Sequence, residues 1–300
     1  MRDGTRLRVA CWRPAGPPRG TCLVLPGRSE FLEKYEHTVA DLLRRGLVVC
    51  SLDWRGQGLS DRVLPDRMKG HIDRYETWLD DADAVMAQWV APRAVGPLLL
   101  LAHSMGGHIG LRWLAERRPA FDAAVFSAPM VDIHVPLNRT LARGVVRLLT
   151  LAGRGRHYTL GHGPRDPHRF NFETNPITTD QANWLRLQSL LNERPELAIG
   201  GVTNGWVDAT FRSIDRLWRV AGDIALPSLV LSAPDDFFVR DDRHAELAAL
   251  MGDARLKRYP GAKHEVLNER PDIRRAVWAD IDAFLAEVGF FAEGAEAAAG

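Results

Sequence analysis

The chain has 300 residues, enough for one large domain or two modest ones with a substantial buried core. Hydrophobic residues make up 46% of the chain and charged residues 26%, which argues against a fibrous, disordered or membrane-spanning protein. The 39 basic residues nearly balance the 38 acidic ones, so the net charge of +1 creates no field that would steer the protein to a nucleic acid.

Short apolar segments alternate with segments of helical periodicity over about the first 130 residues, and the alternation resumes after residue 224. This pattern predicts an α/β fold with a mostly parallel sheet and helices on both faces. Predicted helices carry Trp78 to Trp89, Asp241 to Met251 and Val277 to Val288. The predicted strands are 5–12, 21–25, 47–53, 97–102, 122–127, 227–232 and 254–259.

The middle of the chain interrupts this alternation. Residues 130–224 are rich in Arg, Gly, Pro and Asn around helical fragments such as 181–191, so we expect an insertion that forms a helical cap. The core domain then comprises residues 1–129 and 225–300. Its tail, 292–300, contains only Ala, Gly, Glu and no large side chain, and we expect it to be disordered.

Three cysteines, Cys11, Cys22 and Cys50, lie in apolar strand-like segments near the start of the chain. Because an odd number cannot form a closed disulfide framework, we expect buried free thiols. The first residues lack an apolar stretch followed by a cleavage site, and no run of about 18 apolar residues occurs. We therefore expect a cytoplasmic protein without a signal peptide or transmembrane helix.

Ser104 lies where a buried strand ends and a helix begins, in the run A-H-S-M-G-G. A serine on such a sharp turn needs small neighbours two positions away on either side, and Ala102 and Gly106 occupy those positions. The N–H of Met105, at the helix start, would be free to bind an anion. Ser104 is thus the candidate nucleophile; the alternative is a simple helix N-cap.

A nucleophilic serine of this type needs a base and an acid, which follow it in the chain in α/β-hydrolases. His264 lies in a loop after a predicted strand and is the candidate base, whereas the side chain of His103 should point away from Ser104. Asp236, in the loop after the strand 227–232, is the favoured acid. The alternatives are Asp235 and Asp132.

A second oxyanion donor is expected from the loop that follows the strand 21–25. The N–H of Arg28 is the candidate there, and together with the N–H of Met105 it would form the oxyanion hole. Asp53 also follows a strand, but it precedes Ser104 in the chain and lies in a Gly-punctuated turn, so we interpret it as a structural turn residue.

With these residues in place, most of the chain resembles the bacterial lysophospholipase and monoacylglycerol lipase group of α/β-hydrolases. The resemblance implies the helical cap, with lid segments at 174–182 and 200–209, and the register of its acid loop favours Asp236. Pro26 and Ala102 stand where the group has His and Gly. The resemblance to this group rests on four segments: P-G-R-S-E-F-L-E-K-Y, D-W-R-G-Q-G-L-S, A-H-S-M-G-G and L-S-A-P-D-D-F-F-V.

The function expected from the residues and the resemblance is hydrolysis of carboxylic esters, of small molecules or lipids, through an acyl-enzyme on Ser104, without a metal or cofactor. A serine aminopeptidase-like amidase with the same triad and a catalytically idle binding scaffold are the alternatives. Aromatic residues of the cap are candidates for an acyl-chain pocket, or for the cap's own core: Phe170, Phe172, Trp184, Trp206 and Phe211.

One cap segment has the pattern of a basic amphipathic helix. Arg139, Arg143 and Arg147 recur every four residues and share one face. Such a helix could rest transiently on an anionic membrane surface, which would make the protein peripheral to the inner membrane; an ordinary solvated face has the same pattern. The leucines that flank the arginines are Leu137, Leu141, Leu148 and Leu151.

Overall fold

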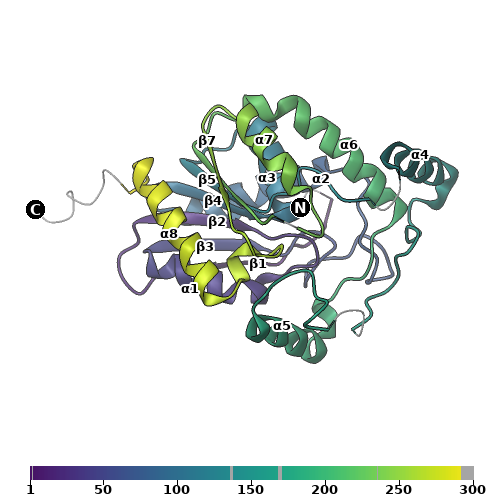
Figure 1. Ribbon diagram of the computed structural model, residues 1–300, viewed down its shortest axis with the longest axis horizontal. Helices are drawn as coiled ribbons and strands as arrows, with labels where there is room; N and C mark the ends of the chain where they lie inside the picture. Colours follow the sequence, from purple (N-terminus) through teal and green to yellow (C-terminus); the bar gives the residue numbers. More distant parts are fainter. Residues whose placement is uncertain (2, 136–137, 168–170, 235, 292–300) are drawn as a thin grey trace, which may run out of the picture.

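The computed structural model describes residues 1, 3–135, 138–167, 171–234 and 236–291. Its centre is one sheet in the order β1-β3-β2-β4-β5-β6-β7 (Figure 1). Only β1 runs antiparallel to its neighbour, β3, and the other neighbouring strands pair in parallel. The strands are β1 (Val9–Trp12), β2 (Gly20–Leu25), β3 (Leu47–Leu52), β4 (Leu98–His103), β5 (Ala123–Ser127), β6 (Ser228–Ser232) and β7 (Ala254–Arg258).

The predicted α/β fold is therefore confirmed, with each predicted strand present and shorter or shifted by a few residues at most. The helices are α1 (Glu36–Arg44), α2 (Glu76–Val85), α3 (Ser104–Arg117), α4 (Arg139–Leu149), α5 (Gln181–Glu193), α6 (Asn204–Val220), α7 (His244–Leu250) and α8 (Pro271–Glu287). Short helical turns lie at Leu32–Tyr35, Met86–Val90, Ala91–Arg93, Thr150–Arg154, Pro195–Leu197, Ala221–Asp223, Asp241–Arg243 and Val266–Asn268.

The two faces of the sheet are buried against different helices. Successive residues of a strand point to opposite faces, so Leu23 and Leu25 join one core cluster, whereas Cys22 and Val24 join the other. Helices α2, α3, α6 and α7 cover the first face, and α1 and α8 cover the second. Burial on both faces explains why the central strands read as continuous apolar runs.

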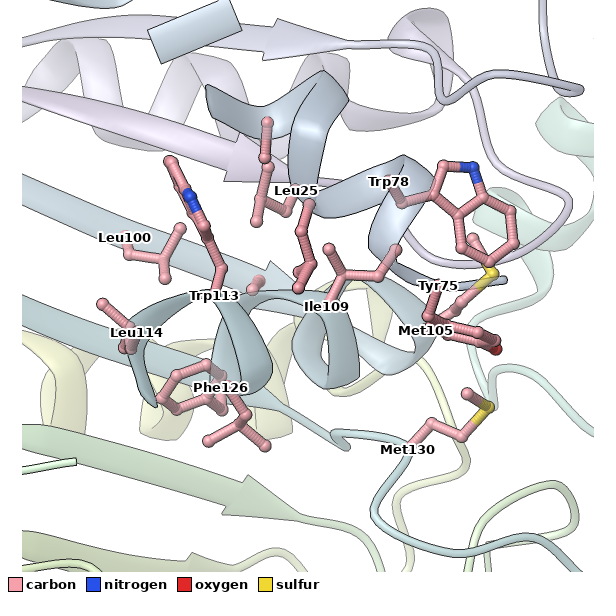
Figure 2. Packing of buried hydrophobic residues seen from close by; sticks show 14 of the residues in the cluster. Leu25, Tyr75, Trp78, Leu100, Met105, Ile109, Trp113, Leu114, Phe126 and Met130 are labelled. Atoms are coloured by element: carbon pink, nitrogen blue, oxygen red, sulfur yellow. The ribbon is translucent and has the colours of Figure 1, made fainter. Parts of the chain in front are cut away.

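Helix α3 is the best-buried helix beside the sheet. Its residues Ile109 and Trp113 pack among Leu100 of β4 and Phe126 of β5 (Figure 2). The Trp113 indole is fully buried, and its N–H donates a 2.7 Å hydrogen bond to Asp83. Burying side chains of this size contributes about 1.5–3 kcal/mol each, so the start of α3, which carries Ser104, is firmly held.

The middle of the chain separates into two parts. Helices α4 and α5 lie away from the sheet, at the edge of the molecule (Figure 1). Helix α6 returns to the core, since Trp206, Ala209 and Leu217 belong to the same buried cluster as α3. The tail, 292–300, lies outside the described residues.

The expectation of three free thiols is wrong for two of the cysteines. Cys11 and Cys50 face each other across the β1–β3 pair, with Cα atoms 4.2 Å apart, and form a disulfide. Cys22 is free, and burial raises the pKa of its thiol well above the ordinary value. The sequence pattern located the strands but did not show that β1 and β3 are neighbours.

Among the described residues, no helix combines the length with the apolar composition needed to cross a bilayer.

Candidate active site

Ser104 occupies the turn between β4 and α3 with a φ of 51°, a conformation that residues with a side chain rarely adopt. The loop after β2 passes close to the first turn of α3. A Cβ atom on Gly106 would lie 2.3 Å from the carbonyl oxygen of Leu25 and 2.4 Å from that of Pro26. Glycine is therefore required at 106, and it brings the β2 loop against the serine.

The structure brings Ser104, His264 and Asp236 together in one hydrogen-bonded series. The Oγ atom of Ser104 lies 2.8 Å from Nε2 of His264, and Nδ1 of His264 lies 2.5 Å from a carboxylate oxygen of Asp236. Because an ionised carboxylate only accepts hydrogen bonds, Nδ1 carries the proton, which leaves Nε2 to accept the serine hydroxyl proton. All three residues are buried.

Asp236 is held as an anion by its surroundings. Its second carboxylate oxygen accepts the N–H groups of Phe238 at 2.7 Å and Val239 at 3.1 Å. Burial alone would raise the pKa of this carboxyl, but the His264 imidazole and these N–H groups together lower it below the ordinary value. Asp132 is instead ion-paired to Arg139 and Arg243, and Asp235 lies outside the described residues.

The two candidate oxyanion donors come from the start of α3 and from the loop after β2. Met105 is the second residue of α3, so its N–H has no acceptor within the helix. Arg28 follows the stretch of loop that contacts Gly106, and the loop is held by the Trp54 indole N–H, which donates to the carbonyl of Pro26 at 2.7 Å.

Asp53 is confirmed as a structural turn residue. Its carboxylate accepts the N–H groups of Leu32 at 2.9 Å and Leu59 at 2.8 Å, and it pairs with the Arg8 guanidinium. It thereby joins the turn after β3 to the loop that carries Arg28.

Sequence reasoning missed a buried charge cluster beside the site. The Glu30 carboxylate accepts hydrogen bonds from the Gly27 N–H, the Tyr35 hydroxyl and, at 2.7 Å, the Lys34 ammonium. Lys34 also pairs with Glu265, the residue after His264. Burial opposes ionisation of Glu30, but Lys34 and His103 together lower its pKa below the ordinary value. The Glu30–Lys34 spacing of four was a usable signal; the link to Glu265 exists only in three dimensions.

Two rings flank the imidazole of His264. The His103 ring lies 4.8 Å from it and the Phe238 ring 5.1 Å, between centroids. The Nδ1–H of His103 donates to the carbonyl of Ser127 at 2.9 Å, and its Nε2 lies 3.6 Å from the Glu30 carboxylate. Phe238 keeps 38% of its surface exposed and forms an apolar wall next to His264 that the sequence analysis did not identify.

The candidate pocket aromatics are spread over residues 130–224. Trp206 lies next to Arg28, with the guanidinium carbon 5.7 Å from the ring. Phe211 is buried beneath the guanidinium groups of Arg139 and Arg143, so it packs between α4 and α6. Trp184 is buried on α5, Phe172 is half-buried, and Phe170 lies outside the described residues.

In the part of the chain that the structure describes, no three His, Cys, Asp or Glu side chains are grouped so that they could hold a metal ion. The other buried histidines in the sheet core have both ring nitrogens engaged. His108 bonds the Met130 carbonyl and the Ser213 hydroxyl, and His244 bonds the Ser232 hydroxyl and the Pro129 carbonyl.

A family model described as "Serine aminopeptidase, S33" matches residues 16–271. The chain belongs to this α/β-hydrolase family. The chain is 30% identical to a probable lysophospholipase L2 of Haemophilus influenzae over 275 residues, which cover 91% of this chain and 86% of that protein. It is 32% identical to lysophospholipase L2 of Escherichia coli K12, over 87% of this chain and 79% of that protein.

Human monoglyceride lipase is a more distant relative, at 24% identity over 95% of this chain and 88% of the human protein. Among solved structures, monoglyceride lipase from Saccharomyces cerevisiae matches with a TM-score of 0.73 and 20% identity, covering 95% of this chain and 94% of the yeast chain. The structural match shows that the α/β-hydrolase fold extends over nearly the whole molecule.

Proposed function

We propose that this carboxylic ester hydrolase works through an acyl-enzyme on Ser104, with His264 as general base and Asp236 as the residue that orients the imidazole. The observation that carries the proposal is the pair of hydrogen bonds that His264 makes, 2.8 Å to the serine hydroxyl and 2.5 Å to the carboxylate. A base within this reach can take the hydroxyl proton as the serine oxygen attacks.

In the first half of the reaction, Oγ of Ser104 attacks the ester carbonyl carbon while Nε2 of His264 takes the proton. The negative charge that develops on the carbonyl oxygen is stabilised by the N–H groups of Arg28 and Met105. His264 then protonates the leaving alkoxide as the ester bond breaks. Water, activated by the same imidazole, releases the acid and restores Ser104.

We propose that the substrate is a lipid with a single acyl ester, and that a lysophospholipid is preferred to a monoacylglycerol. The relatives at 30% and 32% identity are named lysophospholipases, whereas those named monoglyceride lipase are less similar. Such a substrate has a long apolar chain, and the half-exposed Phe238 beside His264 offers apolar surface for it.

We further propose that residues 130–224 act as the cap over this site. A segment of the cap contacts the loop of His264 directly: the N–H of Glu265 donates to the carbonyl of Ile177 at 2.8 Å. The hydroxyl of Thr178 donates to the carbonyl of Asn268 at 2.7 Å. Movement of this segment would therefore displace the loop that carries the His264 imidazole.

The test is covalent labelling with a fluorophosphonate probe, followed by a substrate panel of lysophosphatidylcholine, monoacylglycerol, short-chain p-nitrophenyl esters and aminoacyl amides. We expect one label per chain, none in Ser104→Ala, and hydrolysis of the lipid esters. Full esterase turnover in Ser104→Ala would overturn the mechanism. Cleavage of the amides alone would favour an aminopeptidase, and absence of both labelling and turnover would favour a binding scaffold.

Contact with a membrane surface is proposed for α4, through its apolar side. Arg139, Arg143 and Arg147 point toward acidic partners, Asp132, Asp215 and Asp208. The opposite side of the helix is apolar and solvent-exposed, including Leu148 at 68% exposure, and Leu137 lies outside the described residues. An exposed apolar stripe suits insertion at a bilayer surface, and the partly exposed arginines on the other side of the helix add positive charge that favours an anionic bilayer. The exposed stripe consists of Leu141, Val145, Leu148 and Leu151.

Flotation with vesicles that contain anionic phospholipid tests this contact. We expect the protein to float with them, and Leu148→Ser to weaken the association. Leu185→Ser, at an exposed leucine of α5, is the matched control and should float like the unmodified protein. Equal flotation of all three proteins, or no dependence on anionic lipid, would dispose of the contact.

A further inference from the structure

The Arg28 side chain has an unusual setting beside the site. It is half-buried, and one terminal nitrogen donates to the carbonyl of Gly200 while the other donates to the Ser29 hydroxyl at 3.2 Å. Its Nε atom is buried without a hydrogen-bond partner. Within the described part of the chain, no carboxylate lies within ion-pair distance of this guanidinium.

Arg55 and Arg112 have carboxylate partners, whereas Arg62, like Arg28, has no ion-pair partner among the described residues. Arg55 pairs with Asp81 at 2.7 Å, and Arg112 pairs with Glu76 at 2.8 Å and with a second carboxylate. Burial lowers the pKa of Arg28 to about 10, so its guanidinium still carries a positive charge at neutral pH. An uncompensated buried charge is costly, and it suits a position where an external anion completes the site.

Gly70, Trp206 and Tyr75 surround the guanidinium of Arg28. A Cβ atom on Gly70 would lie 3.0 Å from a terminal nitrogen of Arg28, so glycine gives the side chain its space. The Trp206 ring lies on another side, and Tyr75 is close enough to affect the charge. Tyr75 lies at the same end of α3 as Met105, the second candidate oxyanion donor (Figure 2).

We propose that the Arg28 guanidinium is the subsite for the phosphate of a lysophospholipid headgroup. The inference rests on the proposed function and adds a determinant of its substrate class. The N–H of Arg28 would bind the ester carbonyl oxygen, and its guanidinium would bind the phosphate of the same lipid. Arginine is well suited to phosphate because its N–H groups can bind two oxygens at once.

Substitution at Arg28 tests the subsite when the acyl chain is kept constant. kcat/KM is measured for lysophosphatidylcholine and for the monoacylglycerol with the same chain, and for a short p-nitrophenyl ester. Loss of a charged hydrogen bond predicts a fall of about 10- to 100-fold for the lysophospholipid in Arg28→Gln. The fall should be smaller for the two uncharged substrates, so the deciding measurement is the ratio of kcat/KM for the lysophospholipid to kcat/KM for the monoacylglycerol. Arg28→Lys, which keeps the charge, should fall in between.

Arg62→Gln is the matched control. Arg62 donates to the carbonyls of Glu196 and Ala198, in the segment that also accepts from Arg28, and burial lowers its pKa to about 10 as well. It should leave the ratio of lysophospholipid to monoacylglycerol turnover unchanged. Two outcomes would overturn the proposal: an equal loss of kcat/KM on all substrates in Arg28→Gln, or the same change of the substrate ratio in Arg62→Gln. Either would show that Arg28 only holds the cap segment in place.

A competition experiment on the unmodified protein avoids any folding defect of the variants. Glycerophosphocholine should slow labelling of Ser104 by the fluorophosphonate probe in the unmodified protein and not in Arg28→Gln. Protection by inorganic phosphate alone would assign the subsite to a free anion and contradict the headgroup proposal. Failure of the proposed function is distinguishable, because the unmodified protein would then neither take the label nor cleave the p-nitrophenyl ester.

Discussion

Asp236 and Asp132 are buried carboxylates on neighbouring loops, joined where the N–H of Arg240 donates to the carbonyl of Asp132 at 3.1 Å, yet their side chains have different partners. Asp236 bonds the His264 imidazole, whereas Asp132 pairs with Arg139 and Arg243. Two residues of the same type at the same edge of the sheet thus have separable roles.

We therefore expect Asp236→Asn to reduce kcat by about 10⁴-fold, because an amide in place of the carboxylate favours the wrong tautomer of His264. Asp132→Asn should keep kcat within a few-fold and instead lower thermal stability, since it leaves Arg139 without its anion and Arg243 with Glu246 as its remaining partner. Steady-state kinetics on a p-nitrophenyl ester and thermal unfolding measure both effects. A larger kcat loss in Asp132→Asn would reverse the assignment of the acid.

Gly106→Ala should destabilise the protein by about 2–3 kcal/mol or more, because its new methyl group would overlap the backbone carbonyls of Leu25 and Pro26. Gly144→Ala, in the exposed middle of α4 where nothing lies within 4 Å, should stabilise by up to about 1 kcal/mol. Denaturant unfolding compares the two. Equal stability of Gly106→Ala and the unmodified protein would contradict the close approach of the β2 loop to α3.

Glu30→Gln should lower stability at neutral pH by about 3 kcal/mol, because it leaves the buried Lys34 with one anion and replaces one of the two acceptor oxygens by an amide NH2, which only donates. The folded-state pKa of Glu30 is lowered, so its stabilisation is fully present above its ordinary value of 4.5 and is lost as the pH falls through the lower folded value.

Unfolding free energies measured at intervals between pH 7 and the acid limit should therefore converge for Glu30→Gln and the unmodified protein as the pH falls. Glu36→Gln, at an exposed position one turn further along, is the control and should follow the unmodified protein throughout. A constant difference between Glu30→Gln and the unmodified protein at all pH values would count against an ionised Glu30.

The Cys11–Cys50 disulfide predicts one reactive thiol per denatured chain without reductant and three after reduction. It closes a loop of about 39 residues, so reduction should lower stability by up to about 4 kcal/mol. Thiol titration and unfolding with and without reductant measure these effects. The double variant Cys11→Ser, Cys50→Ser should not respond to reductant, and three thiols without reduction would exclude the bond.

The sequence by itself determined the features that depend on near neighbours in the chain. The apolar runs predict the buried strands because residues at two-residue intervals share one face of a sheet. The small residues around Ser104 predict the sharp turn because the steric requirement falls within a few positions of the serine. The alternation of strands and helices also determined the fold class. The chain order of Ser104, Asp236 and His264 can be taken directly from the sequence.

Only the tertiary structure decided which distant groups meet. It placed Asp236 rather than Asp132 against His264, joined Lys34 to Glu265 and set Cys11 opposite Cys50. These contacts depend on the order of strands in the sheet and on the packing of loops at its carboxyl edge. The strand order and the loop packing are determined by the requirement to bury both faces of the sheet together. This requirement involves the whole chain, so no short sequence pattern shows it.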